Sequence, residues 1–194
     1  CFSAVFHLSR ILSSENIPKI VPLIPMLVYI INKNLQLKEL ATTLFINFII
    51  NHANNELMRK GLQESNGMEV LFKLLKENPN NELMISSYSN WAQYQPKEIE
   101  QSLIDHIDEF ADIVSKIFTD EKIKLQTLYS DKLLLICEKC PLLAEKLGQT
   151  QILTCIVSKL SSNQLDDHPE LRKSFISMIL VFYQTAKNPK QLIV

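Results

Sequence analysis

Residues 35–51, which read LQLKELATTLFINFIIN, are apolar on nearly every side of an expected helix. The exception is a strip formed by Thr43, Asn47 and Asn51, which are four residues apart. Residues four apart lie on one side of an α-helix, one turn above another. A helix with this pattern is covered on most sides by other helices and exposes only a narrow polar strip. We therefore expect residues 35–51 to form an inner helix of a helical array.

A three-helix pattern recurs along the chain at a nearly constant interval. Its marker is the last apolar residue of the helix that precedes each inner helix, and successive markers are 42 to 44 residues apart: Ile31, Leu75, Phe118 and Leu160. This interval is the unit length of armadillo and HEAT repeats, which stack into a right-handed superhelix. We therefore predict an all-α fold, an α-solenoid of about four to five armadillo- or HEAT-like repeats. It is expected to form a single armadillo-like domain over residues 1–194.

Prolines mark four of the boundaries between the expected helices, at Pro79, Pro96, Pro141 and Pro169, because the residue before a proline disfavours helical geometry. Pro22 and Pro25 instead fall inside an expected helix, and we expect them to kink or delay it. The expected helices cover residues 2–13, 17–32, 35–51, 54–64, 67–76, 80–94, 97–105, 108–118, 122–139, 142–147, 149–160 and 169–186.

The composition disfavours several classes of function. The chain is 46% hydrophobic and 21% charged with a formal net charge of −1, so it has no overall field that attracts nucleic acid or an anionic membrane. Its three glycines are too few and too scattered for a phosphate-binding loop. The longest apolar run, residues 20–31, is too short to span a bilayer. We expect a cytoplasmic protein with no nucleic-acid or membrane partner, and, since the chain opens on Cys1 within an apolar pattern, a fragment of a larger protein.

The polar strips of the inner helices are the candidate binding site. Residues 80–94 carry a second strip that contains Ser86, Asn90 and Gln93. Hydroxyl and amide side chains in such strips can hydrogen-bond the backbone of an extended peptide. Trp91, the only tryptophan, either flanks this groove or packs in the core. The predicted groove residues are Thr43, Asn47, Asn51, Ser86, Asn90, Trp91 and Gln93.

Basic residues near the strips are candidates for binding a phosphate group on the peptide. Arg59 and Lys60 are adjacent in the sequence, and Lys124 and Lys132 share one expected helix. Such side chains form charge-assisted hydrogen bonds with phosphate oxygens. The alternative is that each is an ordinary solvated charge.

Signatures of catalysis or metal binding are weak. Cys137 and Cys140 have ligand-like spacing, but a structural zinc site needs four ligands and no second Cys or His pair accompanies them. We interpret them as core cysteines of a protein in a reducing compartment. No nucleophile-and-base motif is present, although a triad assembled by the fold is not visible in a sequence. We therefore expect a domain that is not an enzyme and that holds no metal or cofactor.

Several stretches resemble one family of proteins. They are residues 98–103, residues 141–143, and Phe182-Tyr183 together with residues 188–194. Over residues 67–194 the chain resembles the C-terminal armadillo region of mitotic-exit and septation-initiation network protein kinases, including plant MAP kinase kinase kinase epsilon relatives. The resemblance implies an N-terminal serine/threonine kinase domain in the full protein. It also implies that this region brings the kinase to a spindle-pole-body or centrosomal scaffold in mitosis.

The resemblance also bears on the groove. Asn47 and Asn90 resemble the asparagines with which armadillo repeats hold a peptide backbone, whereas the equivalent positions of the later inner helices are expected near Leu135 and Tyr183. The hypothesis is therefore a non-catalytic domain that recruits a mitotic kinase to a scaffold by binding a phosphorylated extended segment. The alternatives are a homodimerisation module that controls the attached kinase and a general tethering adaptor unrelated to kinases.

Overall fold

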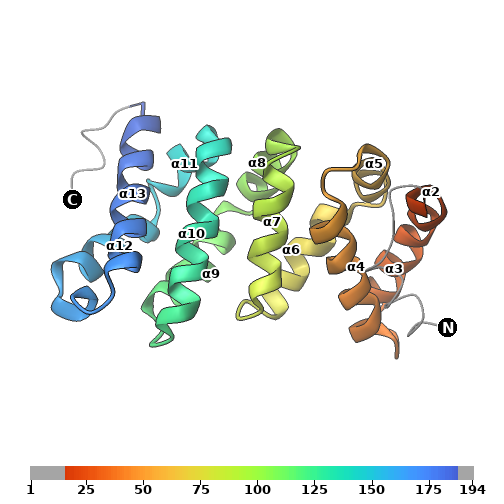
Figure 1. Ribbon diagram of the computed structural model, residues 1–194, viewed down its shortest axis with the longest axis horizontal. Helices are drawn as coiled ribbons and strands as arrows, with labels where there is room; N and C mark the ends of the chain where they lie inside the picture. The colour runs from red at the N-terminus through yellow and green to blue at the C-terminus, as the bar shows by residue number, and fades with distance from the viewer. Residues whose placement is uncertain (1–15, 188–194) are drawn as a thin grey trace. The chain divides into compact units, whose positions relative to one another are not determined.

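The computed structural model describes residues 16–187, apart from the side chain of Asn163. The helix expected at residues 2–13 and the last stretch of the resemblance, residues 188–194, lie outside this range. Within the described range the chain is helical and contains no strand, which confirms the all-α prediction. The chain divides into two compact units, Cys1–Glu77 and Asn78–Val194. Figure 1 shows their helices with the labels used below.

Prolines interrupt the first part of the first unit. One helix is expected over residues 17–32, but the structure divides this range into α2 (Ile17–Ile20), a 3₁₀ turn η2 (Val21–Leu23) and α3 (Ile24–Asn32). Pro22 and Pro25 cannot donate to the helical hydrogen-bond ladder, which accounts for the break as expected. The remaining helices of this unit are α4 (Lys38–His52), α5 (Glu56–Glu64) and α6 (Gly67–Glu77).

Apolar packing holds the first unit together. Helix α4 packs against α3 and fully buries Phe45, Phe48 and Ile49. Gly61 on α5 permits a close approach to η2, because a Cβ atom at this position would lie 2.7 Å from Val21 Cγ1. The burial of each large apolar side chain contributes about 1.5–3 kcal/mol, so these contacts dominate the stability of the unit.

The second unit begins with α7, which is followed by two successive groups of three helices, α8 to α10 and α11 to α13. Three of its helices begin at a proline: Pro96, Pro141 and Pro169. Proline is tolerated there because the first N–H groups of a helix have no acceptor within the helix, so the missing N–H costs no hydrogen bond. The elements are α7 (Glu82–Ala92), α8 (Pro96–Asp105), α9 (Ile107–Thr119), α10 (Ile123–Lys139), α11 (Pro141–Leu147), α12 (Gln151–Ser161), the 3₁₀ turn η3 (Asn163–Leu165) and α13 (Pro169–Thr185).

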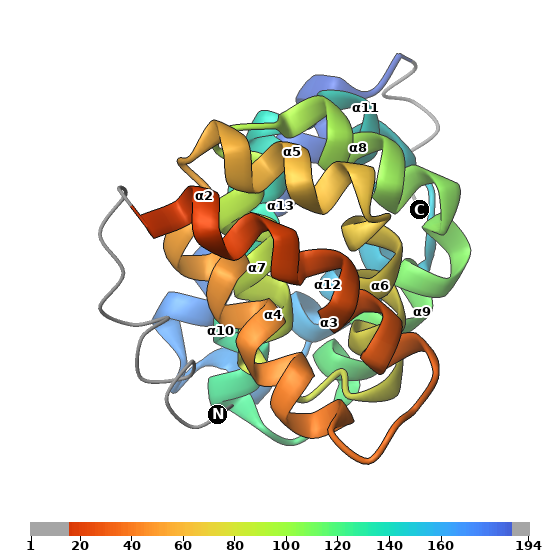
Figure 2. The same ribbon diagram turned by 90° about the vertical axis from the view of Figure 1, so that its right-hand side faces the viewer.

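Corresponding helices of the two groups pack against each other. Helix α10 packs against α7 on one side and α13 on the other, and the three stand side by side in Figure 1. Helix α9 packs against α12, and α8 packs against α11, as Figure 2 shows for the latter pair. We call α7, α10 and α13 the third helices, because α10 and α13 are each the last helix of a group of three and α7 packs against α10 in the same layer. This layered packing places one exposed face of the three helices on the same side of the second unit.

Long-range contacts fix these layers. The rings of Phe118 on α9 and Phe175 on α13 meet edge to face with their centroids 4.9 Å apart. The buried hydroxyl of Tyr129 on α10 donates a hydrogen bond to the carbonyl of Pro79, which lies just before α7. Glu100 Oε1 on α8 accepts hydrogen bonds from the first free N–H groups of α11, Leu142 N at 2.7 Å and Leu143 N at 3.3 Å. A carboxylate at a helix N-terminus is favourable, so Glu100 serves as the cap of a helix to which it does not belong.

Candidate functional site

The burial pattern establishes which positions of the third helices correspond. The buried residues of α7 match those of α10 at an offset of 41 residues, as from Tyr88 to Tyr129. Those of α10 match those of α13 at an offset of 45 residues, as from Leu133 to Met178. These offsets make Asn90 equivalent to Asp131 and Ile176. The expectation that the equivalents lie near Leu135 and Tyr183 is therefore wrong, because the ends of the preceding helices do not determine the register along the inner ones. Leu135 is four residues beyond Asp131, about one turn, and Tyr183 is seven residues beyond Ile176, about two turns.

These equivalent positions define an exposed face of the second unit, which we call the third-helix face. Its first row consists of Ser86, Thr127 and Arg172, and its second of Asn90, Asp131 and Ile176. Each of these side chains is at least partly exposed.

Asp131 was missed by sequence reasoning, although a signal for it exists. The tripeptide Tyr88-Ser89-Asn90 recurs as Tyr129-Ser130-Asp131, which alone is sufficient to align α7 with α10. The structure places the Asp131 carboxylate against α13, where it accepts a hydrogen bond from the Ser174 hydroxyl. Asp131 therefore faces the junction between α10 and α13, and by the same rotation Asn90 faces the junction between α7 and α10.

Trp91 does not belong to the groove. Its side chain is fully buried, and its indole N–H donates a hydrogen bond to Glu98 Oε2 at 3.0 Å. A peptide on the surface cannot contact it, so the core alternative is correct for this residue. The neighbouring predicted residues differ, since Ser86 and Asn90 are partly exposed and Gln93 is exposed.

The predicted groove residues of α4 lie in the first unit. Thr43 and Asn51 are exposed, and the Thr43 hydroxyl donates to the carbonyl of Glu39 at 2.9 Å. Asn47 is partly buried, and its amide nitrogen has no hydrogen-bond partner within the part of the chain that is described. Thr43 and Asn51 are therefore on the surface as predicted, whereas the amide nitrogen of Asn47 between them is buried. Its use in peptide binding remains a prediction, as does that of the residues on α7.

The four basic candidates do not form one cluster within either unit. In the first unit, Arg59 donates to the carbonyl of Ala53 at 2.8 Å, and Lys60 Nζ lies 3.8 Å from Glu64 on the same helix. In the second unit, Lys124 and Lys132 are eight residues apart on α10, about 12 Å along the helix axis. A single phosphate needs several donors within hydrogen-bond distance, so each lysine can contribute only as a separate contact.

Cys137 and Cys140 carry buried thiols that are unsuited to act as nucleophiles or metal ligands. Both are buried, as expected for core cysteines, and Cys140 Sγ donates to the carbonyl of Pro96 at 3.3 Å. Burial raises the pKa of both thiols, that of Cys140 to about 12, so both stay protonated at neutral pH. Among residues 16–187 no group of three or more His, Cys, Asp or Glu side chains could hold a metal ion. No helix in the same range is long and apolar enough to cross a bilayer.

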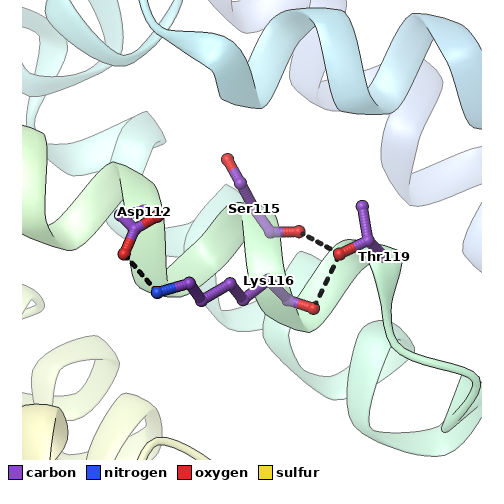
Figure 3. Close-up of polar contacts among 4 residues, drawn as sticks. All are labelled: Asp112, Ser115, Lys116 and Thr119. Carbon is purple, nitrogen blue, oxygen red and sulfur yellow. Dashed lines mark hydrogen bonds and ion pairs between the residues drawn. The ribbon is translucent and has the colours of Figure 1, made fainter.

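A second surface feature lies where α9 and α12 end. A pocket of about 310 Å³ is lined by polar residues that include Thr119, Cys155 and Lys159. Figure 3 shows that the Thr119 hydroxyl is directed at its own helix, where it donates to the carbonyls of Ser115 and Lys116, both at 3.0 Å. Lys116 in turn pairs with Asp112 at 2.6 Å. The Thr119 hydroxyl is therefore already paired within its own helix, and Asp112, Ser115 and Lys116 are not among the residues that line the pocket.

Comparison with family models, with curated proteins and with solved structures finds no match to this chain.

Proposed function

We propose that this chain is a non-catalytic protein-interaction domain that holds an extended segment of a partner on its third-helix face. The observation that carries the proposal is the alignment of exposed positions across three packed helices, with Asn90 and Asp131 in one row. The Asn90 amide can both donate and accept hydrogen bonds with the backbone of a segment that crosses the helices, and the Asp131 carboxylate can accept them. An armadillo-like arrangement of the helices is part of this proposal.

The partner and the biological setting are proposed from the resemblance described above. The segment would belong to a spindle-pole-body or centrosomal scaffold, and the domain would bring an attached mitotic kinase to it. Phosphorylation of the segment would add about two negative charges. Lys124 and Lys132 are the candidates in the second unit to bind the phosphate, and each would make one separate contact with a phosphate group.

The test is a fluorescence anisotropy titration of the 194-residue chain with labelled scaffold peptides. Each peptide is measured with and without phosphoserine, at two salt concentrations. We expect phosphate-dependent binding that weakens as salt rises, because exposed charges are screened. Asn90→Ala should weaken binding several-fold, while Asn80→Ala, the same change at an exposed position before α7, should not.

A homodimerisation module is the second candidate, and one observation favours it. Ile176, Leu180 and Tyr183 form an exposed apolar stripe on α13, with exposed fractions of 46, 55 and 55%. Exposed apolar stripes of this kind often mark protein contacts. Light scattering separates the candidates, since a dimer that binds neither form of any scaffold peptide would support dimerisation and refute peptide recruitment.

A further inference from the structure

A row of exposed apolar side chains crosses the third-helix face. Tyr94, Leu135 and Leu180 are exposed by 47, 42 and 55%. They occupy equivalent positions, because the same offsets of 41 and 45 residues that align the buried residues also relate these three. Leu135 lies on α10 and Leu180 on α13, whereas Tyr94 lies two residues beyond Ala92, the last residue of α7. Because α10 packs against both α7 and α13, we place the three side chains in succession across this face. We call them the apolar row.

The spacing of the row selects the conformation of a ligand. The axes of packed helices are about 8–10 Å apart, so successive members of the row are separated by about that distance. A chain in the polyproline II conformation advances about 3.1 Å per residue with three residues per turn. Every third side chain therefore points to the same side and recurs after about 9 Å. A flat β-strand does not fit, because its third neighbours point to opposite faces.

Charged residues of α10 lie on opposite sides of the row. Asp131 faces α13, as its hydrogen bond with Ser174 shows. Successive helical residues are about 100° apart, so Glu138, seven residues on, lies on the same side as Asp131. Lys132 and Lys139 lie about 80–100° round the helix, towards α7. None of these four charges has an ion-pair partner within residues 16–187.

The junctions beside α10 therefore differ in charge. Asn90 on α7 and Gln93, which caps the C-terminal end of that helix, face the first junction and are uncharged, so Lys132 and Lys139 leave it positive. Asp131 and Glu138 leave the second junction negative near the row. The nearest exposed cation on the facing side of α13 is Lys173, about 10 Å along the helix from Leu180.

We propose that the apolar row binds a polyproline II segment of a partner protein with large apolar residues at every third position. Read from α7 towards α13, the segment carries an acidic residue between its first and second apolar residues and a basic residue between its second and third. The acidic position is also where a phosphorylated residue fits. This inference rests on the proposed function and specifies the chemistry of the partner.

The probe is a labelled peptide with the core Leu-Pro-Asp-Leu-Pro-Lys-Leu, flanked by Gly-Ser at both ends. A peptide of the same composition, Leu-Asp-Leu-Lys-Leu-Pro-Pro, moves the apolar residues to alternate positions. A third peptide replaces Asp and Lys by Ser. In anisotropy titrations with the 194-residue chain, we expect the alternate-position peptide to bind at least tenfold more weakly than the probe, and the uncharged peptide several-fold more weakly.

Protein variants locate the binding on the row. Leu135→Asp should weaken probe binding at least tenfold, because it places a charge against an apolar residue of the segment. Leu142→Asp is the matched control, since Leu142 on α11 is also 42% exposed but lies outside the row. Lys132→Glu together with Lys139→Glu should abolish the preference for the probe over the uncharged peptide. Unfolding midpoints of all variants are measured, and a variant whose midpoint falls is replaced by Leu135→Ser.

Failure of the row and failure of the proposed function give different results. If scaffold peptides bind but the probe does not, or if Leu135→Asp and Leu142→Asp bind the probe equally well, the row is overturned and the proposed function stands. If neither the scaffold peptides nor any designed peptide binds, both fall.

Discussion

The hydrogen bond from Tyr129 to Pro79 holds α10 against the start of α7, and removing it should weaken the unit that carries the third-helix face. The change is Tyr129→Phe, which keeps the ring and deletes only the hydroxyl. A net hydrogen bond of this kind contributes about 0.5–1.5 kcal/mol, so we expect the free energy of unfolding to fall by about 1 kcal/mol at pH 7. Tyr183→Phe is the control, because its hydroxyl is on a side chain that is 55% exposed, and it should change stability by less than about 0.5 kcal/mol.

The same variant has a pH dependence whose sign follows from burial. Burial raises the pKa of Tyr129 in the folded chain, whereas an unfolded tyrosine ionises near pH 10. The stabilisation that this group provides is therefore complete below pH 10 and is lost as the pH rises above it, since only the unfolded state releases the proton. At pH 10.5 the parent has lost about 0.8 kcal/mol through this group, and Tyr129→Phe loses nothing through it. The difference in the free energy of unfolding between parent and variant should therefore shrink from about 1 kcal/mol at pH 7 to about 0.2 kcal/mol at pH 10.5.

The assay is urea unfolding followed by circular dichroism, with a reductant present, at several values between pH 7 and pH 10.5. The comparison uses the difference between parent and variant, so titration of all other groups cancels. A gap that stays constant with pH would refute the burial argument. No gap at pH 7 would refute a stabilising role of the hydrogen bond.

Other predictions follow from individual contacts. Asn81→Ala should destabilise the chain by about 1 kcal/mol, because Asn81 caps α7 by accepting from Leu83 N at 3.1 Å, and the adjacent exposed Asn80→Ala should not; thermal unfolding measures both. Glu100→Ala should cost about 1–3 kcal/mol, because it leaves the first N–H groups of α11 without their acceptor, and urea unfolding tests this. Cys140→Ala should reduce the loss of stability between pH 9 and pH 10.5, because burial raises the pKa of this thiol to about 12 and only the unfolded state ionises in that range. Equal pH dependence in parent and variant would contradict the last prediction.

Most helices could be predicted because their signals are local. The prolines at 96, 141 and 169 stand at helix starts in the structure as expected, and Pro22 and Pro25 break the helix that contains them. Apolar periodicity is a property of neighbouring residues along the chain, so it needs no knowledge of distant contacts. The separation of the chain into two compact units depends on contacts between segments and is not visible in this periodicity.

The candidate site was predicted less completely, because it depends on helix rotation. The exposed strip of α7 was found from the spacing of its polar residues, whereas Trp91 was a groove candidate only because it adjoins Asn90, and it is buried against Glu98. A tryptophan beside an exposed asparagine lies only about 100° round the helix, so a small rotation decides between surface and core. Burial of α7 and α10 makes Asp131 equivalent to Asn90, and the tripeptide at residues 88–90, repeated at 129–131, is the one signal in the sequence for this equivalence.

The sequence by itself determined the helical class of this protein and the polar strips of its inner helices, because spacings of three and four residues set which side chains share a helix face. Only the tertiary structure decided which faces meet. Glu100 caps α11 from 42 residues away, and Asp131 faces α13 through Ser174, 43 residues distant. The apolar row of Tyr94, Leu135 and Leu180 is inferred for the same reason, since packing between α7, α10 and α13 determines which side chains become neighbours.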